Sequence, residues 1–311
     1  MAALFYVGGN DMKDVYLFSG FLGSGKTSML VDVLSQLKEK GLRPAVMMNE
    51  IGQMSFDSDQ VDSDVPLREV LDGCICCSGV ESTEAQIQTL LTQYDFDVLI
   101  IETTGAAHPV EALDAVYSPL FAESLNIKGI VTVVDSKLWL NRASLTPQAR
   151  ALFLEQIRHP HLLIANKSDL LTEAEKATLV FDLQGLNHEA FILQTQNGKV
   201  PLQLLESLQA TTLTNQKVQP VQIGKHFQLS SRLIEFHHSF EKEEFEQWIQ
   251  SLPETVYRMK GYVPIKGIRH PMLFQYAYGL VQWLPEYMNM PPKIVMIGEN
   301  IHEIPIIGEE K

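Results

Sequence analysis

The sequence predicts an α/β protein, in which a doubly wound and mostly parallel sheet is followed by a smaller α+β domain. Short, almost continuous apolar runs alternate with helical patterns over the first two-thirds of the 311 residues. Such runs are expected of parallel strands that are covered on both faces. Residues 210–220 are rich in Thr, Gln and Asn and have no apolar period. We therefore predict two domains, 1–215 and 216–311.

Six apolar runs are the candidate strands of the first domain: residues 15–18, 44–48, 98–101, 130–134, 162–165 and 191–193. Between the first two, apolar residues at helical spacing predict an amphipathic helix that buries Met29, Leu30, Val33, Leu34 and Leu37. Ligands of such sheets bind at the carboxyl ends of the strands, so the residues that follow these runs are the first candidates for a site.

The second domain shows a mixed pattern. Residues 233–240, 274–284 and 294–297 are candidate strands, and residues 241–252 form a candidate helix. His237 and His238 fall within the first of these strands, so we expect their rings to point to opposite faces and not to share a metal ion. Phe274 and Tyr276 alternate along the next strand and are expected to cover the helix as core.

Composition restricts the class of protein. A 45% hydrophobic content suits a globular chain with a substantial core, and a formal charge of −14 argues against nucleic acid or an anionic membrane surface as partner. No apolar run approaches the roughly 18 residues of a membrane span. The N-terminus has no basic segment of a signal peptide, and the three cysteines form no pairing framework. We therefore expect a cytoplasmic protein that binds neither nucleic acid nor membrane.

A glycine-rich loop follows the first predicted strand and opens the first helix. Its residues, Gly20-Phe21-Leu22-Gly23-Ser24-Gly25-Lys26-Thr27, match the pattern G-x-x-x-x-G-K-[ST]. The glycines let backbone N–H groups surround phosphates, and Lys26 is placed to contact the β- and γ-phosphates while Thr27 ligates Mg²⁺. The sequence thus predicts a P-loop NTPase-like fold whose nucleotide contacts are Gly20, Gly23, Ser24, Gly25, Lys26, Thr27 and Ser28.

The run Asn166-Lys167-Ser168-Asp169 follows the fifth predicted strand and indicates the base. Asp169 can accept hydrogen bonds from the ring N–H and the exocyclic amine of guanine, and the stem of Lys167 can pack over the base plane. Adenine has no such donor pair, so the pattern favours GTP over ATP and disfavours a P-loop kinase. Alternatively, Asp169 caps the helix that follows.

A second group of acids follows the other strands. Glu102 ends the strand 98–101 and can hold Mg²⁺ through a water, and Gly105 can present its N–H to the γ-phosphate. Asn49-Glu50-Ile51-Gly52 opens a loop containing Asp57 that is a candidate first switch segment. No residue stands out as a water-positioning glutamine or an internal arginine finger, so we expect slow hydrolysis, with Lys26, Thr27, Glu102 and Gly105 as the catalytic residues.

All three cysteines lie in Cys74-Ile75-Cys76-Cys77, just before a helix N-terminus marked by an S-x-x-E capping box. The helix dipole lowers thiol pKa and favours thiolates, which select Zn²⁺ or Cu⁺. A mixed site with Glu50 as the fourth ligand, or with His108 or a client residue, can also take Co²⁺, Ni²⁺ or Fe²⁺. Buried small hydrophobes, a redox pair and part of an iron–sulfur site are the alternatives.

Taken together, these motifs resemble those of the CobW-type metallochaperone GTPases, which are relatives of the nitrile hydratase activators. The resemblance rests on the phosphate loop, Asn49-Glu50-x-Gly52, Gly73-Cys74-Ile75-Cys76-Cys77, Glu102-x-x-Gly105, Asn166-Lys167-x-Asp169, Arg258-x-Lys260-Gly261 and Ile297-Gly298. It implies GTP binding with slow hydrolysis, transition-metal binding at the cysteines, and delivery of metal to a client. The chain departs from the family pattern at Gln53 and His108, and it lacks a histidine-rich run.

The sequence therefore predicts a GTP-dependent chaperone that carries a transition metal, with zinc favoured, to a client metalloprotein. The alternative is a GTP-dependent regulatory or assembly switch that acts through its C-terminal domain and carries no metal. Arg258 and Lys260 can contact either the nucleotide domain or the client, and a homodimer is a further candidate partner.

Overall fold

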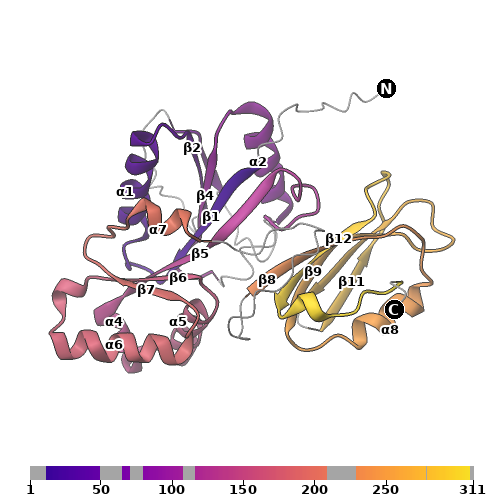
Figure 1. Ribbon diagram of the computed structural model, residues 1–311. Coiled ribbons are helices and arrows are strands. Elements are labelled where there is room, and N and C mark those ends of the chain that lie inside the picture. Colours follow the sequence, from indigo (N-terminus) through magenta and orange to yellow (C-terminus); the bar gives the residue numbers. More distant parts are fainter. Residues whose placement is uncertain are drawn as a thin grey trace.

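The computed structural model describes residues 12–49, 65–70, 80–107, 116–208, 229–277 and 279–308. It contains two sheets that lie side by side, each with its own helices (Figure 1). The first comprises β1 (Lys13–Gly20), β2 (Pro44–Asn49), β3 (Leu67–Val70), β4 (Val98–Glu102), β5 (Leu125–Asp135), β6 (Leu162–Asn166) and β7 (Phe191–Gln194). Its helices are α1 (Lys26–Glu39), α2 (Val80–Gln93), α4 (Ser136–Leu140), α5 (Pro147–Arg158), α6 (Glu173–Leu186) and α7 (Leu202–Glu206).

The strands of the first sheet are all parallel and follow the order β3-β2-β4-β1-β5-β6-β7 within the described residues. The predicted doubly wound α/β fold is therefore confirmed. Each of the six predicted strands is present, and β3 is an additional edge strand. Its sequence, Leu-Arg-Glu-Val, carries two charges in four residues and lacks the apolar run of a strand covered on both faces.

Side chains alternate across this sheet and fill a core on each face. On one face, Val15 and Leu17 of β1 pack with Ile87 and Leu90 of α2. On the other face, Tyr16 and Phe18 pack with the apolar stripe of α1 and with Leu202 and Leu205 of α7. The predicted helix is therefore present, and all five of its predicted core residues are buried. In Figure 1, α1 and α7 lie on the side of the sheet opposite to α2.

The second sheet is antiparallel and has the order β11-β10-β9-β12-β8 within the described residues. It comprises β8 (Leu229–Glu235), β9 (Val256–Val263), β10 (Met272–Ala277), β11 (Leu280–Leu284) and β12 (Lys293–Glu299), with α8 (Lys242–Gln250) packed across it. Phe245 of α8 lies 5.2 Å from the ring of Phe274, as expected from the sequence. An α+β C-terminal domain is thus confirmed, and its boundary predicted at 215 lies outside the described residues.

Two predicted strands in this domain were wrong in extent. The run 233–240 leaves the sheet after Glu235, so His237 and His238 lie in a bend and the strand argument about their rings does not apply. The run 274–284 is a hairpin, because Gly279 takes a φ of +88° and reverses the chain between β10 and β11. Only glycine adopts that conformation readily, and the apolar alternation on both sides of it concealed the turn.

The two domains share a buried contact at α2. Val295 and Ile297 of β12 belong to the same core cluster as Ile87 and Leu90. Beside this cluster, Nζ of Lys260 donates to Oε1 of Glu84 at 2.7 Å, and both side chains are mostly buried. Of the two contacts expected for Lys260, the one with the nucleotide domain is therefore present. Removing either partner would leave the other charge buried and unpaired, so the pair fixes how α2 and β9 meet.

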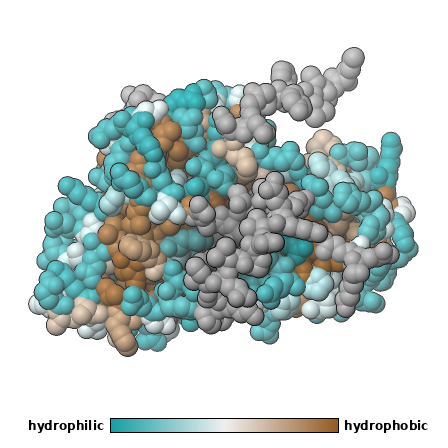
Figure 2. Space-filling model, in the orientation of Figure 1, coloured by the Kyte–Doolittle hydropathy of each residue, from teal (hydrophilic) through white to brown (hydrophobic). Residues whose placement is uncertain are grey.

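Figure 2 shows hydrophilic residues over most of one face, with the largest hydrophobic area on the half that holds the parallel sheet. Within the described ranges, no helix has both the length and the apolar content to cross a bilayer.

His161 should make stability depend on pH. Its Nδ1 accepts from the N–H of Ile130 at 3.1 Å, and burial lowers its pKa from 6.5 to about 4. Because the folded-state pKa is the lower one, the unfolded chain takes up the proton first as pH falls. The stabilisation is complete above pH 6.5 and is lost as pH falls towards 4. We expect the free energy of unfolding to drop by about 1–2 kcal/mol from this group between pH 6.5 and 5, measured by urea denaturation. His161→Gln has no titrating ring and should remove that part of the pH dependence; an unchanged profile would contradict the assignment.

Candidate nucleotide site at the carboxyl edge of the parallel sheet

The loop between β1 and α1 is shaped by glycines. Gly20, Gly23 and Gly25 have φ values of 140°, 72° and 103°. A Cβ at Gly20 would lie 2.2 Å from the carbonyl oxygen of Val133, and a Cβ at Gly25 would lie 2.3 Å from Nδ2 of Asn166. The loop is therefore folded too tightly for a side chain at either position, and its backbone turns back onto the N-terminus of α1.

Two polar side chains inside this loop suit an anion. Lys26 is 8% exposed, and its Nζ donates to the carbonyls of Gly20 at 2.9 Å and Phe21 at 3.3 Å. The hydroxyl of Ser24 is fully buried and has no hydrogen-bond partner among the described residues. A buried cation, an unsatisfied donor and a helix N-terminus together fit a polyphosphate. Ser28 is exposed on the first turn of α1.

A hydroxyl and a carboxylate meet beside the loop. Oγ1 of Thr27 donates to Oε1 of Glu102 at 3.4 Å, and Glu102 is 6% exposed at the end of β4. β4 is the neighbour of β1, with Glu102 as register partner of Phe18. Hard oxygen ligands of this kind, next to a phosphate loop, fit Mg²⁺. Sequence reasoning placed both residues at one metal, and the fold brings them together.

The turn after Glu102 packs directly on the phosphate loop. A Cβ at Gly105 would lie 2.6 Å from the N and 2.8 Å from the Cα of Leu22. Thr103 ties the start of the turn to β1, since its N–H donates to the carbonyl of Phe18 at 2.9 Å. Gly105 thus lies directly against the phosphate loop, and its lack of a side chain is required for that approach.

Asn166 acts as a clamp in this structure. Its Nδ2 donates to the carbonyl of Ser24 at 2.8 Å, and its Oδ1 accepts from the N–H of Gly198 at 3.0 Å. Gly198 lies in the connection between β7 and α7, which sequence reasoning did not single out. Its signal was present, because Asn197-Gly198 after a strand is typical of a tight turn. Asn166 therefore joins the phosphate loop to the adjacent loop.

Lys167 and Asp169 differ in their surroundings. Nζ of Lys167 donates to the carbonyl of Gly23 at 2.7 Å and to Oδ2 of Asp135 at 2.5 Å. Asp135 ends β5 and was missed in the sequence, although an acid directly after an apolar strand was the signal. Asp169 is exposed. The helix α6 is capped instead by Thr172, in a capping box with Glu175, so the alternative role of Asp169 as its cap is wrong.

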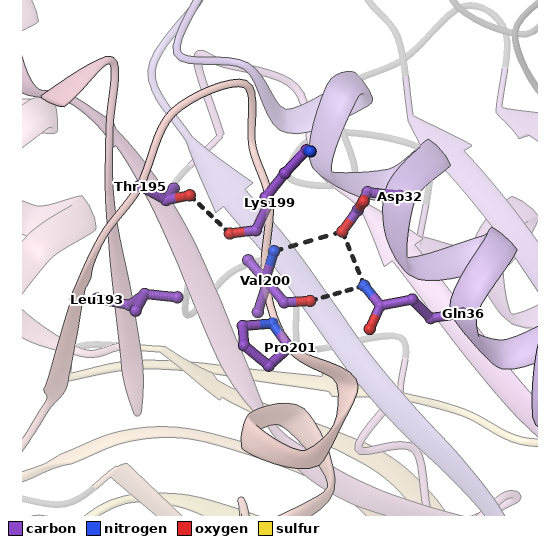
Figure 3. Close-up of a pocket in the computed structure, with 7 residues that line it drawn as sticks. All are labelled: Asp32, Gln36, Leu193, Thr195, Lys199, Val200 and Pro201. Atoms are coloured by element: carbon purple, nitrogen blue, oxygen red, sulfur yellow. Dashed lines mark hydrogen bonds between the residues drawn. The ribbon is translucent and has the colours of Figure 1, made fainter. Parts of the chain in front are cut away.

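A pocket of about 370 Å³ lies between α1 and the connection that follows β7 (Figure 3). Its polar groups bond to one another. Gln36 of α1 donates to the carbonyl of Val200 at 2.7 Å and accepts from the N–H of Leu202 at 2.9 Å. Asp32 accepts from the N–H of Val200 at 3.3 Å. These contacts pin residues 200–202 to α1 and so hold the nearby Gly198 in place.

Replacing Asn166 tests the clamp. Asn166→Ala leaves the buried carbonyl of Ser24 and the N–H of Gly198 without this partner, so we expect the free energy of unfolding to fall by about 2 kcal/mol. Asn166→Asp is the matched comparison: it keeps the acceptor for Gly198 but places a buried carboxylate oxygen against the carbonyl of Ser24, so it should lose at least as much stability as the alanine variant. Denaturant unfolding of both variants measures the difference. Equal stability of Asn166→Ala and the parent protein would rule the clamp out.

The predicted metal ligands Cys74, Cys76, Cys77 and Glu50 lie outside the described residues, as do His108, Gln53 and Asp57. Their flanking elements are described. Asn49 ends β2 and is the register partner of Val70, which ends β3. The segments that carry Glu50 and the cysteines therefore leave the sheet from neighbouring positions, and α2 begins at Val80, three residues after Cys77.

Comparison with known proteins identifies the class. The family model described as CobW/HypB/UreG, nucleotide-binding domain matches residues 14–194, and the cobalamin synthesis protein cobW C-terminal domain matches residues 229–306. The chain thus belongs to the CobW/HypB/UreG nucleotide-binding family and carries a CobW C-terminal domain. The resemblance drawn from its motifs is confirmed.

Individual relatives share about 30% or less of their aligned residues with this chain. The chain is 31% identical to the zinc chaperone YeiR of Escherichia coli over 196 residues, which cover 63% of this chain and 58% of YeiR. It is 27% identical to the zinc chaperone YjiA of E. coli over 84% of this chain and 85% of YjiA. The crystal structure of Zn(II)-bound YjiA GTPase from E. coli matches with a TM-score of 0.49 and 22% identity, over 93% of this chain and 95% of that chain. The match to YeiR spans less than two-thirds of that relative's length.

Proposed function

We propose that this protein is a GTP-binding and slowly GTP-hydrolysing metal chaperone that delivers a transition metal, with zinc favoured, to a client metalloprotein. The observation that carries the proposal is the strand order β3-β2-β4-β1. The ends of β1 and β4, which carry the phosphate loop and Glu102, thus lie at the same edge as the ends of β2 and β3, which Glu50 and the cysteines follow in the sequence. Neighbouring parallel strands lie about 4.8 Å apart, so β1 and β3 are separated by roughly 14 Å. A nucleotide-dependent movement of the segments that follow β4 and β2 can therefore reach both the nucleotide site and the metal site.

We infer the nucleotide roles from the motifs, and the contacts of Lys26, Thr27 and Glu102 support them. Lys26 and the N–H groups of the glycine loop bind the phosphates, and Asp169 binds guanine. When bound, Mg²⁺ supplies charge compensation for the phosphates, and Thr27 and Glu102 hold it. Gly105 presents its backbone N–H to the γ-phosphate. A low intrinsic rate is part of the proposal, because the sequence marks no water-positioning glutamine or internal arginine finger.

Zinc is the cargo rather than a resident cofactor. Cys74, Cys76 and Cys77 supply up to three thiolates, and Glu50 supplies a fourth ligand from the neighbouring strand end. Zn²⁺ favours such a tetrahedral, sulfur-rich set, whereas Co²⁺, Ni²⁺ or Fe²⁺ are accepted by mixed ligands. The relatives YeiR and YjiA of E. coli are known as zinc chaperones, which supports this choice. We place the protein in the cytoplasm, where thiols stay reduced.

Release of cargo on hydrolysis tests the proposal. Intact, reduced protein loaded with one equivalent of zinc is mixed with a chromophoric chelator and either Mg–GTP or Mg with a non-hydrolysable GTP analogue. We expect faster transfer of zinc to the chelator with GTP. Transfer at the same rate with both nucleotides, or binding of ATP as tight as binding of GTP, would overturn the proposal.

A second candidate is a regulatory or assembly switch that binds no metal. The contact between the domains favours it, because α2 starts directly after the cysteine segment and carries Glu84, which pairs with Lys260 of the C-terminal domain. This switch would respond to GTP and act through the C-terminal domain. Negligible zinc affinity, together with a GTP-dependent change in proteolysis or hydrogen exchange at α2, would select it.

A further inference from the structure

Gln156 is a fully buried glutamine on a helix outside the predicted site. It lies on α5, whose buried face consists of Phe153, Gln156 and Ile157. Phe153 packs on Phe21 of the phosphate loop, with ring centroids 5.1 Å apart. A buried amide is costly unless it is hydrogen-bonded, so a glutamine in an otherwise apolar stripe calls for an explanation.

The amide of Gln156 holds the turn that carries Gly105. Its Nε2 donates to the carbonyl of Gly105 at 3.2 Å and to the carbonyl of Ala107 at 3.1 Å. Two acceptors around one group identify it as the NH₂ end of the amide, since an oxygen there would face two other oxygens. One side chain thus fixes the rotation of two peptide groups in the turn that lies against Leu22.

The oxygen of the same amide has no hydrogen-bond partner among the described residues. A buried acceptor left unsatisfied opposes folding. The amide leaves its own oxygen unsatisfied but supplies a donor to the carbonyls of Gly105 and Ala107, which an apolar side chain of similar shape could not do. The two bonds to the turn are therefore the contribution that accounts for a glutamine here.

We propose that Gln156 is a positioning residue for the γ-phosphate: it fixes the turn of residues 104–107 so that Gly105 faces the phosphate loop, and it thereby sets the preference for GTP over GDP. This inference rests on the proposed function. GDP lacks the group that Gly105 contacts, so a loss of positioning affects GTP much more than GDP. Phe153 packs on the phosphate loop and Gln156 bonds to the turn of residues 104–107, so α5 supports both segments of the proposed phosphate site.

Gln156→Met tests the inference, because methionine has nearly the same length and shape but no donor. We expect the affinity for a non-hydrolysable GTP analogue to fall about tenfold, equivalent to about 1.4 kcal/mol, with GDP affinity within about twofold of the parent protein. We also expect kcat for GTP hydrolysis to fall. Affinities are measured by competition against a fluorescent GDP, after thermal unfolding has shown that the variant is folded.

Ile157→Val is the matched control, since it loosens the same helix without touching the turn, and it should leave the ratio of the two affinities unchanged. If the methionine variant does not fold, Gln156→Asn keeps an amide but shortens its reach, and the same change of ratio is expected. An unchanged ratio in a folded Gln156 variant overturns this inference. Failure of the parent protein to bind guanine nucleotides at all overturns the proposed function instead.

Discussion

Replacing Asp169 by asparagine should lower the affinity for GTP by at least about 100-fold while leaving stability unchanged. The carboxylate is exposed and caps no helix, so its loss costs the fold little. Its proposed role is to accept two hydrogen bonds from guanine. The amide oxygen of asparagine can accept only one of these, and its NH₂ group then faces the exocyclic amine. Hydrogen bonds to a charged group contribute about 1.5–3 kcal/mol each, so the loss of affinity is large.

The same variant should gain affinity for xanthosine triphosphate, in which a carbonyl replaces the exocyclic amine and accepts from the new NH₂ group. Competition of GTP, ATP and xanthosine triphosphate against a fluorescent nucleotide measures the change. Glu173→Gln provides a matched control, because it neutralises an exposed acid of the neighbouring helix and should leave all three affinities as they are. Unchanged GTP binding in Asp169→Asn would contradict guanine recognition by this residue.

Replacing Cys76 or Cys77 by serine should reduce zinc affinity by at least about 100-fold. A neutral hydroxyl is a far poorer ligand for Zn²⁺ than a thiolate, and removal of one of four ligands weakens the whole site. In the absence of zinc, GTP binding should stay within about threefold of the metal-free parent protein. The cysteine segment leaves the sheet at β3, which is three strands away from the phosphate loop.

Zinc affinity is measured by competition with a chelator of known affinity under reducing conditions. The three cysteines of the chain all belong to this segment, so the control comes from another proposed ligand class. Glu50→Gln should weaken zinc binding less than either serine variant, because it removes an oxygen ligand and keeps the three sulfur ligands. Zinc binding like that of the parent protein in both serine variants would remove the cysteines from the metal site.

Much of the nucleotide domain could be predicted because buried parallel strands are almost continuously apolar. β6 is an example, since each of its residues from Leu162 to Asn166 is buried. β3 and β9 escaped prediction for a different physical reason. Arg68 and Glu69 interrupt β3 at the sheet edge, while β9 alternates buried and partly exposed residues through Arg258 and Lys260. A strand that is covered on one face only gives a weaker signal when its polar residues are long.

The site was predictable in its motifs but not in its supporting contacts. The glycines, Lys26 and Thr27 lie within one continuous segment, so local spacing is enough to find them. Gln156 bonds a turn that is 51 residues away in the sequence, and Asn166 bonds Ser24 across 142 residues. Such pairs depend on the order of the strands and on the packing of α5, which no local pattern encodes. The metal ligands lie outside the described residues, and their roles remain predictions.

The most direct test of the account is the zinc affinity of the intact, reduced protein in two nucleotide states. It is measured by chelator competition with saturating Mg–GDP and with a saturating non-hydrolysable GTP analogue plus Mg²⁺. We predict affinities that differ by at least about tenfold, because coupling between linked sites is typically 1–3 kcal/mol. By the same linkage, zinc should change the affinity for the GTP analogue by an equal factor. Equal zinc affinities in the two states would show that nucleotide and metal are not coupled and would contradict the account.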